Sequence, residues 1–223
     1  MASIRPKVTI LAMVAQNAGF TSPLLDIGAY YDLGYKLGAD AVMAGADSML
    51  TGLSGFGDAA SDESMPVDKA SDSELPWLII TDSAGRMAGK LGHYRHMEYI
   101  RDCIVLASAS SPREYMEYLE HNRYRSILSP KAGGRGADLG YSLERLHADF
   151  GIAHIRVDAV GRLASALLNG GLADELVMIY APLMESMPAV TAFPGIEKDI
   201  RLSLTELERL EGGYFCAHYS VYK

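Results

Sequence analysis

The sequence predicts an α/β fold with a mostly parallel central sheet, antiparallel C-terminal strands and helices on both faces of the sheet. Within residues 152–183, an apolar run, a glycine, a run of helix formers, two glycines and a second apolar run follow one another. This order is typical of a strand–helix–strand unit. Apolar runs also alternate with helix-like segments earlier in the chain, and residues 199–223 read as two strands around a Glu-Gly-Gly turn, which supplies the antiparallel edge.

The central unit, residues 152–183, begins with a strand, and Gly161 marks the turn into its helix. Residues 169–171 (Asn-Gly-Gly) end this helix, and residues 175–181 form the next strand. The apolar positions expected on one side of the helix are Leu163, Ala166, Leu167 and Leu168. A strand that leads directly into a helix leaves backbone N–H groups unpaired, which suits a phosphate. The local pattern by itself favours an ordinary strand–helix–strand unit without a ligand.

The other expected elements follow from the same periodicities. Further strands are expected at residues 7–14, 39–44, 77–81, 102–107 and 125–128, and further helices at residues 24–38, 112–121 and 138–150. Ser111 is a suitable N-cap with Pro112 at the first helical position, and Asp138 is a suitable N-cap for the next helix. Residues 51–76 and the basic residues 131–136 are expected to be loops.

Length and charge limit the class of protein. No linker-like segment divides the 223 residues, so residues 1–223 are expected to form a single domain. A net charge of −8 and a pI of about 5.2 argue against a nucleic acid or an anionic membrane as the main partner. The apolar N-terminal run reads as a first strand and not as a signal peptide. Cys103 and Cys216 lie in apolar segments, which indicates buried, reduced thiols in a cytoplasmic protein.

The local motifs assign neither a metal nor a catalytic residue. His93 and His96 have no third ligand near them in sequence, so a solvated face is favoured over a metal site. The sequence contains no Gly-x-Ser-x-Gly elbow, and neither cysteine lies in a recognisable nucleophile context. The glycine-rich residues 131–136 could contact a phosphate, although a plain loop is favoured.

Four separate segments resemble, in the same order, the dihydrofolate-reductase-like superfamily and, within it, the riboflavin-biosynthesis reductase (RibD C-terminal-like) domain. Residues 5–9 resemble its opening strand, and residues 39–48 resemble its second strand and Gly-x-x-Thr turn, with Ser48 in the threonine position. Residues 78–86 resemble its Asp-Ser-x-x-Arg strand end. Residues 171–176 (Gly-Leu-Ala-Asp-Glu-Leu) resemble the signature that follows its glycine turn and helix.

The resemblance implies a homodimer that transfers a hydride from NADPH to a pyrimidine or pterin, and the riboflavin-pathway members reduce a ribosylamino phosphate. It also implies two glycine turns that face one another and hold the dinucleotide. The implied cofactor-binding residues are Ala44, Gly45, Ser48, Ser83 and Arg86 at one turn and Asp158, Ala159, Val160, Gly161 and Arg162 at the other. Arg86 would pair with a 2′-phosphate and so favour NADPH over NADH.

Three positions depart from the family pattern. Residues 158–161 (Asp-Ala-Val-Gly) replace Glu-Gly-Gly-Gly, so Val160 puts a β-branched side chain where backbone would meet phosphate. Gln16 lies in the segment that replaces Asp-Gly-Lys, so an acid or base at that position is lost. Gly52 lies where a second acidic residue is expected. The alternative to a reductase is therefore a diverged binding or structural homologue with weakened or lost cofactor binding.

Overall fold

The computed structural model describes residues 4–16, 27–53, 74–130, 136–186 and 191–222, and its chain divides into two compact units. Unit 1 comprises Met1–Pro6 and Asp40–Ala153, and unit 2 comprises Lys7–Ala39 and His154–Lys223. Unit 1 is therefore, apart from a short N-terminal segment, an insertion between the two sequence segments of unit 2. The expected single domain stays a prediction, and each unit is described by itself.

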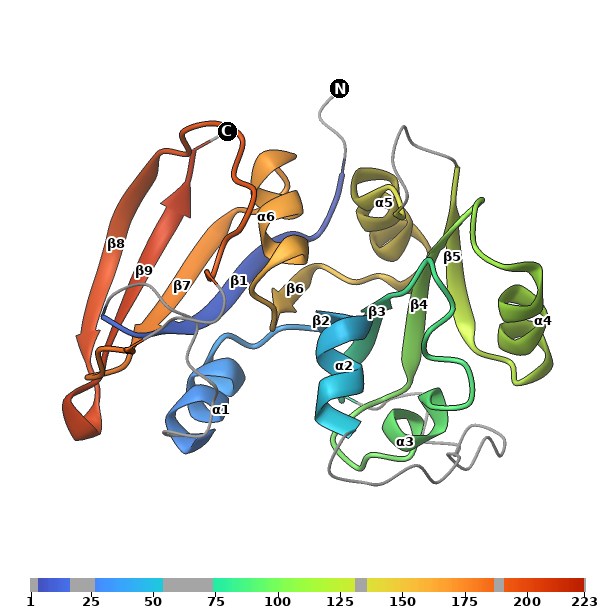
Figure 1. The fold of residues 1–223 in the computed structure, drawn as a ribbon, viewed down its shortest axis with the longest axis horizontal. Coiled ribbons are helices and arrows are strands. Elements are labelled where there is room, and N and C mark those ends of the chain that lie inside the picture. The colour runs from blue at the N-terminus through green and yellow to red at the C-terminus, as the bar shows by residue number, and fades with distance from the viewer. Residues whose placement is uncertain (1–3, 17–26, 54–73, 131–135, 187–190, 223) are drawn as a thin grey trace. The chain divides into compact units, whose positions relative to one another are not determined.

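The described strands of unit 1 are all parallel, in the order β5-β4-β3-β2 (Figure 1). They are β2 (Ala41–Gly45), β3 (Trp77–Thr81), β4 (Cys103–Ser108) and β5 (Arg125–Ser129). Each begins and ends within two residues of its predicted position. Continuous apolar runs are typical of parallel strands because both faces of such a sheet are covered.

Helices cover both faces of the unit 1 sheet. The helices are α2 (Ala46–Leu53), α3 (Leu91–Arg95), α4 (Arg113–His121) and α5 (Leu139–Phe150). Buried residues of α2, α3 and α4 pack in one cluster with Leu78 and Ile80 of β3 and with Val105 of β4. Trp77 points to the other face, because side chains alternate along a strand, and its ring packs edge-on against Phe150 of α5. The predicted helices on both faces are thus confirmed for this unit.

The helix ends of unit 1 agree only partly with prediction. Asp138 caps α5, since its carboxylate accepts a hydrogen bond from the Tyr141 N–H at 3.0 Å. Ser111 is not the N-cap of α4, because Pro112 occupies that position and the Ser111 Oγ accepts from the Ser108 N–H at 3.1 Å. The short helix α3 was not expected. Residues 51–53 continue α2 and are not loop, whereas residues 54–73 and 131–135 lie outside the described residues.

Unit 2 contains the antiparallel strands. Its described strands lie in the order β6-β1-β7-β9-β8, where β1 (Lys7–Val14), β6 (His154–Val157) and β7 (Glu175–Tyr180) are parallel. β9 (Phe215–Val221) pairs antiparallel with both β7 and β8 (Leu202–Arg209). The predicted mostly parallel arrangement with antiparallel C-terminal strands is confirmed (Figure 1).

The described α-helices of unit 2 are α1 (Ile27–Lys36) and α6 (Arg162–Asn169). α1 packs Leu33 against a cluster that contains Leu11 of β1 and Val177 of β7. α6 lies on the opposite face, where Leu168 adjoins Leu176, the residue that precedes Val177 and so points the other way. The buried positions of α6 are Ala164, Ser165, Leu167 and Leu168. Ala166, which was expected on the buried side, is exposed, so the predicted buried side of α6 was wrong by part of a helical turn.

A row of leucines on β8 is exposed. Leu202, Leu204 and Leu207 are 40%, 53% and 62% exposed. A register shift between Leu204 and Glu206 puts Leu204 opposite Tyr219 and Leu207 opposite Ala217. Because Tyr219 and Ala217 are two residues apart on β9, the shift keeps the leucines on one face of the hairpin. We call Leu202, Leu204 and Leu207 the leucine row.

A buried ion pair joins α3 to the start of β4. Arg95 is 1% exposed, and its Nε donates to Asp102 Oδ1 at 3.2 Å. The same carboxylate accepts from the Cys103 N–H at 2.7 Å and from Arg125 Nη1 at 2.6 Å. The remaining Arg95 nitrogens donate to the carbonyls of Asn122 and Arg123. This network satisfies a buried charge with hydrogen bonds, as a low-dielectric interior requires.

Among the described residues, no helix is both long enough and apolar enough to cross a membrane. Cys103 and Cys216 are free and buried, as predicted. Burial raises the pKa of the Cys216 thiol to about 12, and the neighbouring carboxylates of Glu208 and Glu206 add to the shift. Since the thiolate is the reactive form, Cys216 is an inert core residue in the folded protein.

Candidate functional site

The first predicted turn lies at the carboxyl end of β2. Ala44 is buried in the strand, Gly45 is its last residue, and Ser48 is exposed in the first turn of α2. A Cβ atom at Gly45 would have one described neighbour, the Thr81 Oγ1 at 3.7 Å. The backbone at this turn is therefore open to close approach by a ligand, as the resemblance requires of a glycine here.

Ser83 and Arg86 lie in the turn after the next strand, β3. Asp82 is 3% exposed and organises this turn, because its carboxylate accepts from the N–H groups of Arg86 at 3.1 Å and Met87 at 2.9 Å. Ser83 is half-buried and Arg86 is exposed. Asp82 is the first residue of the Asp-Ser-x-x-Arg motif but is not among the predicted site residues, although aspartate is a common turn former.

Gly85 fixes the path of the same turn. Its φ is +75°, and a Cβ atom there would lie 2.9 Å from Cβ and Cγ of Tyr115 on α4. Burial raises the pKa of the Tyr115 hydroxyl well above its ordinary value, and the nearby Asp82 carboxylate adds to the shift. Tyr115 is therefore a neutral packing partner of the turn at physiological pH.

Arg86 already has an anionic partner. Its guanidinium Nη1 forms an ion pair with Asp47 Oδ1, and the two side chains are 48% and 60% exposed. Strands β2 and β3 pair in register, with Gly45 opposite Thr81, so the segments that follow them begin side by side. Asp47 was not predicted, and the only sequence signal for it is its position next to Ser48.

The second predicted turn, residues 158–162, precedes α6 in unit 2. Gly161 has φ 77° and ψ −145°, a conformation open almost only to glycine. Its N–H donates to the Ala192 carbonyl at 2.7 Å, and its own carbonyl accepts from the Ser165 hydroxyl at 3.0 Å. Apart from its chain neighbours Val160 and Arg162, no described residue has a heavy atom within 4 Å of a Cβ built on Gly161, so this backbone is also approachable. Arg162, the first helical residue, is exposed.

The Asp158 side chain is held by Arg156. Two hydrogen bonds join them, from Nε to Oδ1 at 2.8 Å and from Nη2 to Oδ2 at 2.7 Å. Arg156 in turn lies against α1, where a Cβ at Gly34 would overlap its guanidinium. Burial raises the pKa of Tyr30 well above its ordinary value, and the Asp158 carboxylate adds to the shift. A bidentate, mostly buried pair fixes the position of Asp158 at the start of the turn.

The other turn residues, Ala159 and Val160, differ in exposure. Ala159 is buried, whereas Val160 is half-buried. Because the first turn belongs to unit 1 and the second to unit 2, the expected opposition of the two turns stays a prediction. The structure brings together Gly45, Ser48 and Arg86 within one unit and residues 158–162 within the other.

Gln16, at the carboxyl end of β1, has a structural role. Its Nε2 donates to the Ala181 carbonyl at 2.8 Å, and its backbone N–H donates to the Leu183 carbonyl at 2.8 Å. The amide thus ties β1 to the segment that follows β7. A carboxylate at this position could not donate the side-chain hydrogen bond to the Ala181 carbonyl, which gives a physical reason for the departure from an acidic residue.

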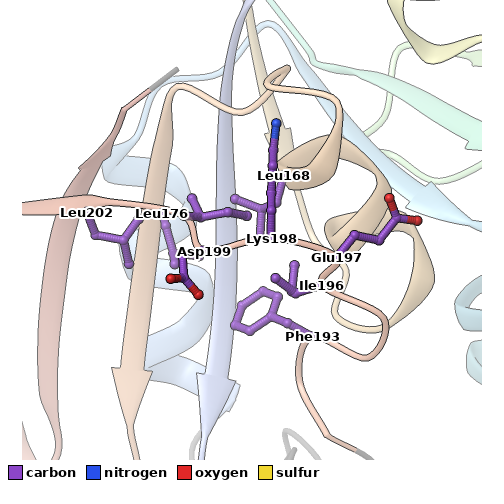
Figure 2. A pocket seen from close by; sticks show the side chains of 9 residues that line it. Leu168, Leu176, Phe193, Ile196, Glu197, Lys198, Asp199 and Leu202 are labelled. Carbon is purple, nitrogen blue, oxygen red and sulfur yellow. The ribbon is translucent and has the colours of Figure 1, made fainter.

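A cavity of about 380 Å³ lies at the other end of α6 from the Gly161 turn (Figure 2). Leu168, Leu176 and Phe193 contribute apolar walls, and the Glu197 side chain points away from them. The segment that lines the cavity contacts the end of α6, where the Asn169 amide donates to the Gly195 carbonyl at 2.9 Å. Ligands of open α/β sheets bind at the carboxyl ends of strands, whereas this cavity lies near the amino end of β7, so we do not assign it to the cofactor.

Each of the two turns, taken by itself, offers groups that suit a phosphate. In the part of the chain that the structure describes, no group of His, Cys, Asp and Glu is suited to hold a metal ion. The approachable backbones at Gly45 and Gly161, together with the Arg86 and Arg162 cations, suit phosphate oxygens. The half-buried Val160 is the feature that fits least well.

Solved structures share this fold. A pyrimidine reductase-like protein from Corynebacterium diphtheriae superposes with a TM-score of 0.74 at 18% identity, covering 98% of this chain and 92% of that one. The riboflavin biosynthesis reductase of Saccharomyces cerevisiae superposes with a TM-score of 0.66 at 14% identity, covering 100% and 92% of the two chains. At these identities the likeness establishes the fold alone.

The sequence comparisons are more specific. The chain is 29% identical over 147 residues to the 2,5-diamino-6-ribosylamino-4(3H)-pyrimidinone 5′-phosphate reductase of Methanothermobacter thermautotrophicus. That match covers 65% of this chain and 60% of the length of the relative. The family model of the RibD C-terminal domain matches residues 34–216, which include both predicted turns. The chain therefore belongs to the RibD C-terminal domain family.

Proposed function

We propose that this protein is an NAD(P)H-dependent reductase of the riboflavin-pathway type, which transfers a hydride to a pyrimidine ribosylamino phosphate or a related pteridine-like substrate. Membership of the RibD C-terminal domain family carries the proposal. The relative from Methanothermobacter thermautotrophicus, whose name gives the substrate class, supports it. The approachable glycine backbones at residues 45 and 161 also support it, because each leaves room for a phosphate group.

In this proposal the cofactor supplies the hydride and the protein binds and orients it. The Arg162 N–H group at the start of α6 and the Arg162 side chain would meet the pyrophosphate beside the Gly161 backbone. The Ser48 hydroxyl would donate to a phosphate oxygen at the start of α2. Ser83 and Arg86 would hold the adenosine end, and Arg86 would pair with a 2′-phosphate. No acid or base is assigned.

A second candidate is a binding or structural homologue with weakened or lost cofactor affinity. Two observations favour it: the Asp158 carboxylate is already paired with Arg156, and Val160 replaces a glycine beside the expected phosphate. The two candidates differ in a direct measurement, because the second binds neither NADPH nor NADH at concentrations that saturate a reductase.

The first prediction concerns nucleotide preference. We expect the purified protein to bind NADPH more tightly than NADH in calorimetric titrations, because Arg86 can pair with the 2′-phosphate. Addition of 2,5-diamino-6-ribosylamino-4(3H)-pyrimidinone 5′-phosphate should then consume NADPH, followed by its absorbance. Equal binding of both nucleotides would contradict the role of Arg86. Absence of binding would contradict the reductase and favour the second candidate.

We also propose that the protein is a cytoplasmic homodimer whose partner is a second copy and whose ligands are small molecules, with neither nucleic acid nor membrane as a partner. The leucine row supports the dimer. It lies on β8, the edge strand of unit 2, and exposure of an apolar face to water is unfavourable. A net charge of −8 opposes self-association elsewhere on the surface, so an apolar patch is the favoured contact.

The second prediction tests this contact. Leu207→Glu should shift the protein from dimer to monomer in light scattering after gel filtration, because it puts a charge in the apolar face. Leu128→Glu on β5 is the matched control, since Leu128 is also half-exposed, at 50%, but lies in unit 1. A monomeric wild type, or loss of the dimer in the control and not in Leu207→Glu, would contradict the proposed interface.

A further inference from the structure

The ion pair between Asp47 and Arg86 bears on which nucleotide the protein selects. Asp47 lies in the first turn of α2, and Arg86 lies in the turn after β3. Since β2 and β3 are neighbouring parallel strands, both residues lie at the carboxyl edge of unit 1, where open α/β sheets bind their ligands. Their side chains are 60% and 48% exposed, so the pair faces solvent and a ligand can reach it.

The backbone beneath Arg86 is fixed, so only its side chain can respond to a ligand. Asp82 accepts from the Arg86 and Met87 N–H groups, and Gly85 is packed against Tyr115. The Cα atom of Arg86 is therefore held, and the direction of the guanidinium depends on the anion that it contacts. In the structure that anion is Asp47.

The two side chains have opposite preferences for the ribose 2′ substituent. A guanidinium favours a 2′-phosphate through charge and paired N–H donors. A carboxylate accepts a hydrogen bond from a free 2′-hydroxyl and repels a phosphate. Asp47 also neutralises Arg86 before any ligand arrives, so a 2′-phosphate must displace one anion in order to gain the contact.

We propose that Asp47 is a specificity-determining residue for the nucleotide: it competes with the 2′-phosphate for Arg86 and accepts from the 2′-hydroxyl of NADH. The protein therefore discriminates less between NADPH and NADH than Arg86 alone would allow. This inference rests on the proposed nicotinamide-dependent function. An acidic residue in a first helical turn also stabilises its helix, so the experiment must separate that role from selectivity.

The test is calorimetric titration of the full chain with NADPH and with NADH. Asp47→Asn keeps the size of the side chain and removes its charge. We expect it to strengthen NADPH binding about three- to tenfold, to weaken NADH binding, and to lose part of this effect at high salt. In the Arg86→Gln background, Asp47→Asn should strengthen NADPH binding only by relieving the repulsion between the carboxylate and the 2′-phosphate, because the competition for Arg86 is gone.

Glu114→Gln is the matched control, since Glu114 is an exposed acidic residue in the first turn of α4. It removes the same helix interaction and should leave the ratio of the two dissociation constants unchanged. An unchanged ratio in Asp47→Asn, or an equal change in Glu114→Gln, would overturn the role of Asp47 while the wild type still binds nucleotide. A wild type that binds neither nucleotide would overturn the proposed function itself, and this inference with it.

Discussion

Asp102→Ala is expected to lower the free energy of unfolding by about 3–5 kcal/mol, because it leaves the Arg95 guanidinium charged and buried without its anion. Arg95 is 1% exposed, so its charge depends on partners within the protein. The substitution also removes the acceptors of the Cys103 N–H and of Arg125. Equilibrium unfolding in urea, followed by circular dichroism, measures the loss.

The control for this prediction is an ion pair in water. Arg113 and Glu117 form a pair on α4 whose side chains are 90% and 58% exposed. Glu117→Ala should cost about 0.3–0.5 kcal/mol, the usual range for exposed helical pairs. If Asp102→Ala costs no more than Glu117→Ala, then Arg95 is not held as a buried cation and the described network is wrong.

Gly85→Ala is expected to lower the free energy of unfolding by about 2–5 kcal/mol, because two penalties act together. The positive φ of 75° is unfavourable for any residue with a Cβ atom. The new methyl group would also lie 2.9 Å from Tyr115 Cβ and Cγ, so α4 or the turn must move. The same movement should displace Arg86 and weaken NADPH binding in a titration at a temperature where the variant is folded.

Gly89→Ala separates the two penalties. Gly89 has a φ of 71°, but no described atom lies within 4 Å of a Cβ built on it. The Gly89→Ala variant should lose only about 1–2 kcal/mol of its free energy of unfolding, which is the cost of the left-handed conformation. Equal losses in the two variants would mean that contact with Tyr115 does not matter. A Gly85→Ala variant with the stability of the wild type would mean that the backbone of the turn adopts another conformation.

The strands could be predicted because each is a short apolar run bounded by polar or glycine residues. The start of α5 could be predicted because the Asp138 side chain specifies an N-cap. The helix α3 was missed because it has only five residues, and four of them, including Arg95, are buried, so it lacks an apolar and a polar side. A buried arginine is recognisable only when its partner Asp102 is seen beside it.

The candidate site also contains residues that could be predicted from the sequence and residues that could not. Gly161 could be predicted because its role follows from its own backbone, which requires glycine. The partners of Arg86 and Asp158 could not, because Asp47 and Arg156 act through side-chain contacts that no local pattern encodes. The sequence thus indicates where ligand groups can approach the chain, whereas the competition for the charged residues appears only in the folded protein.

The insertion of unit 1 into unit 2 has a consequence for synthesis on the ribosome. Residues 40–153 carry every described strand of unit 1, so that sheet can form as soon as its contiguous segment has emerged. β1 is made before this segment, yet Thr9 contacts His154 and Glu175, which lie 145 and 166 positions later. A nascent chain therefore carries this apolar strand without its partners while residues 40–153 are made, and this strand is the segment that a chaperone would shield.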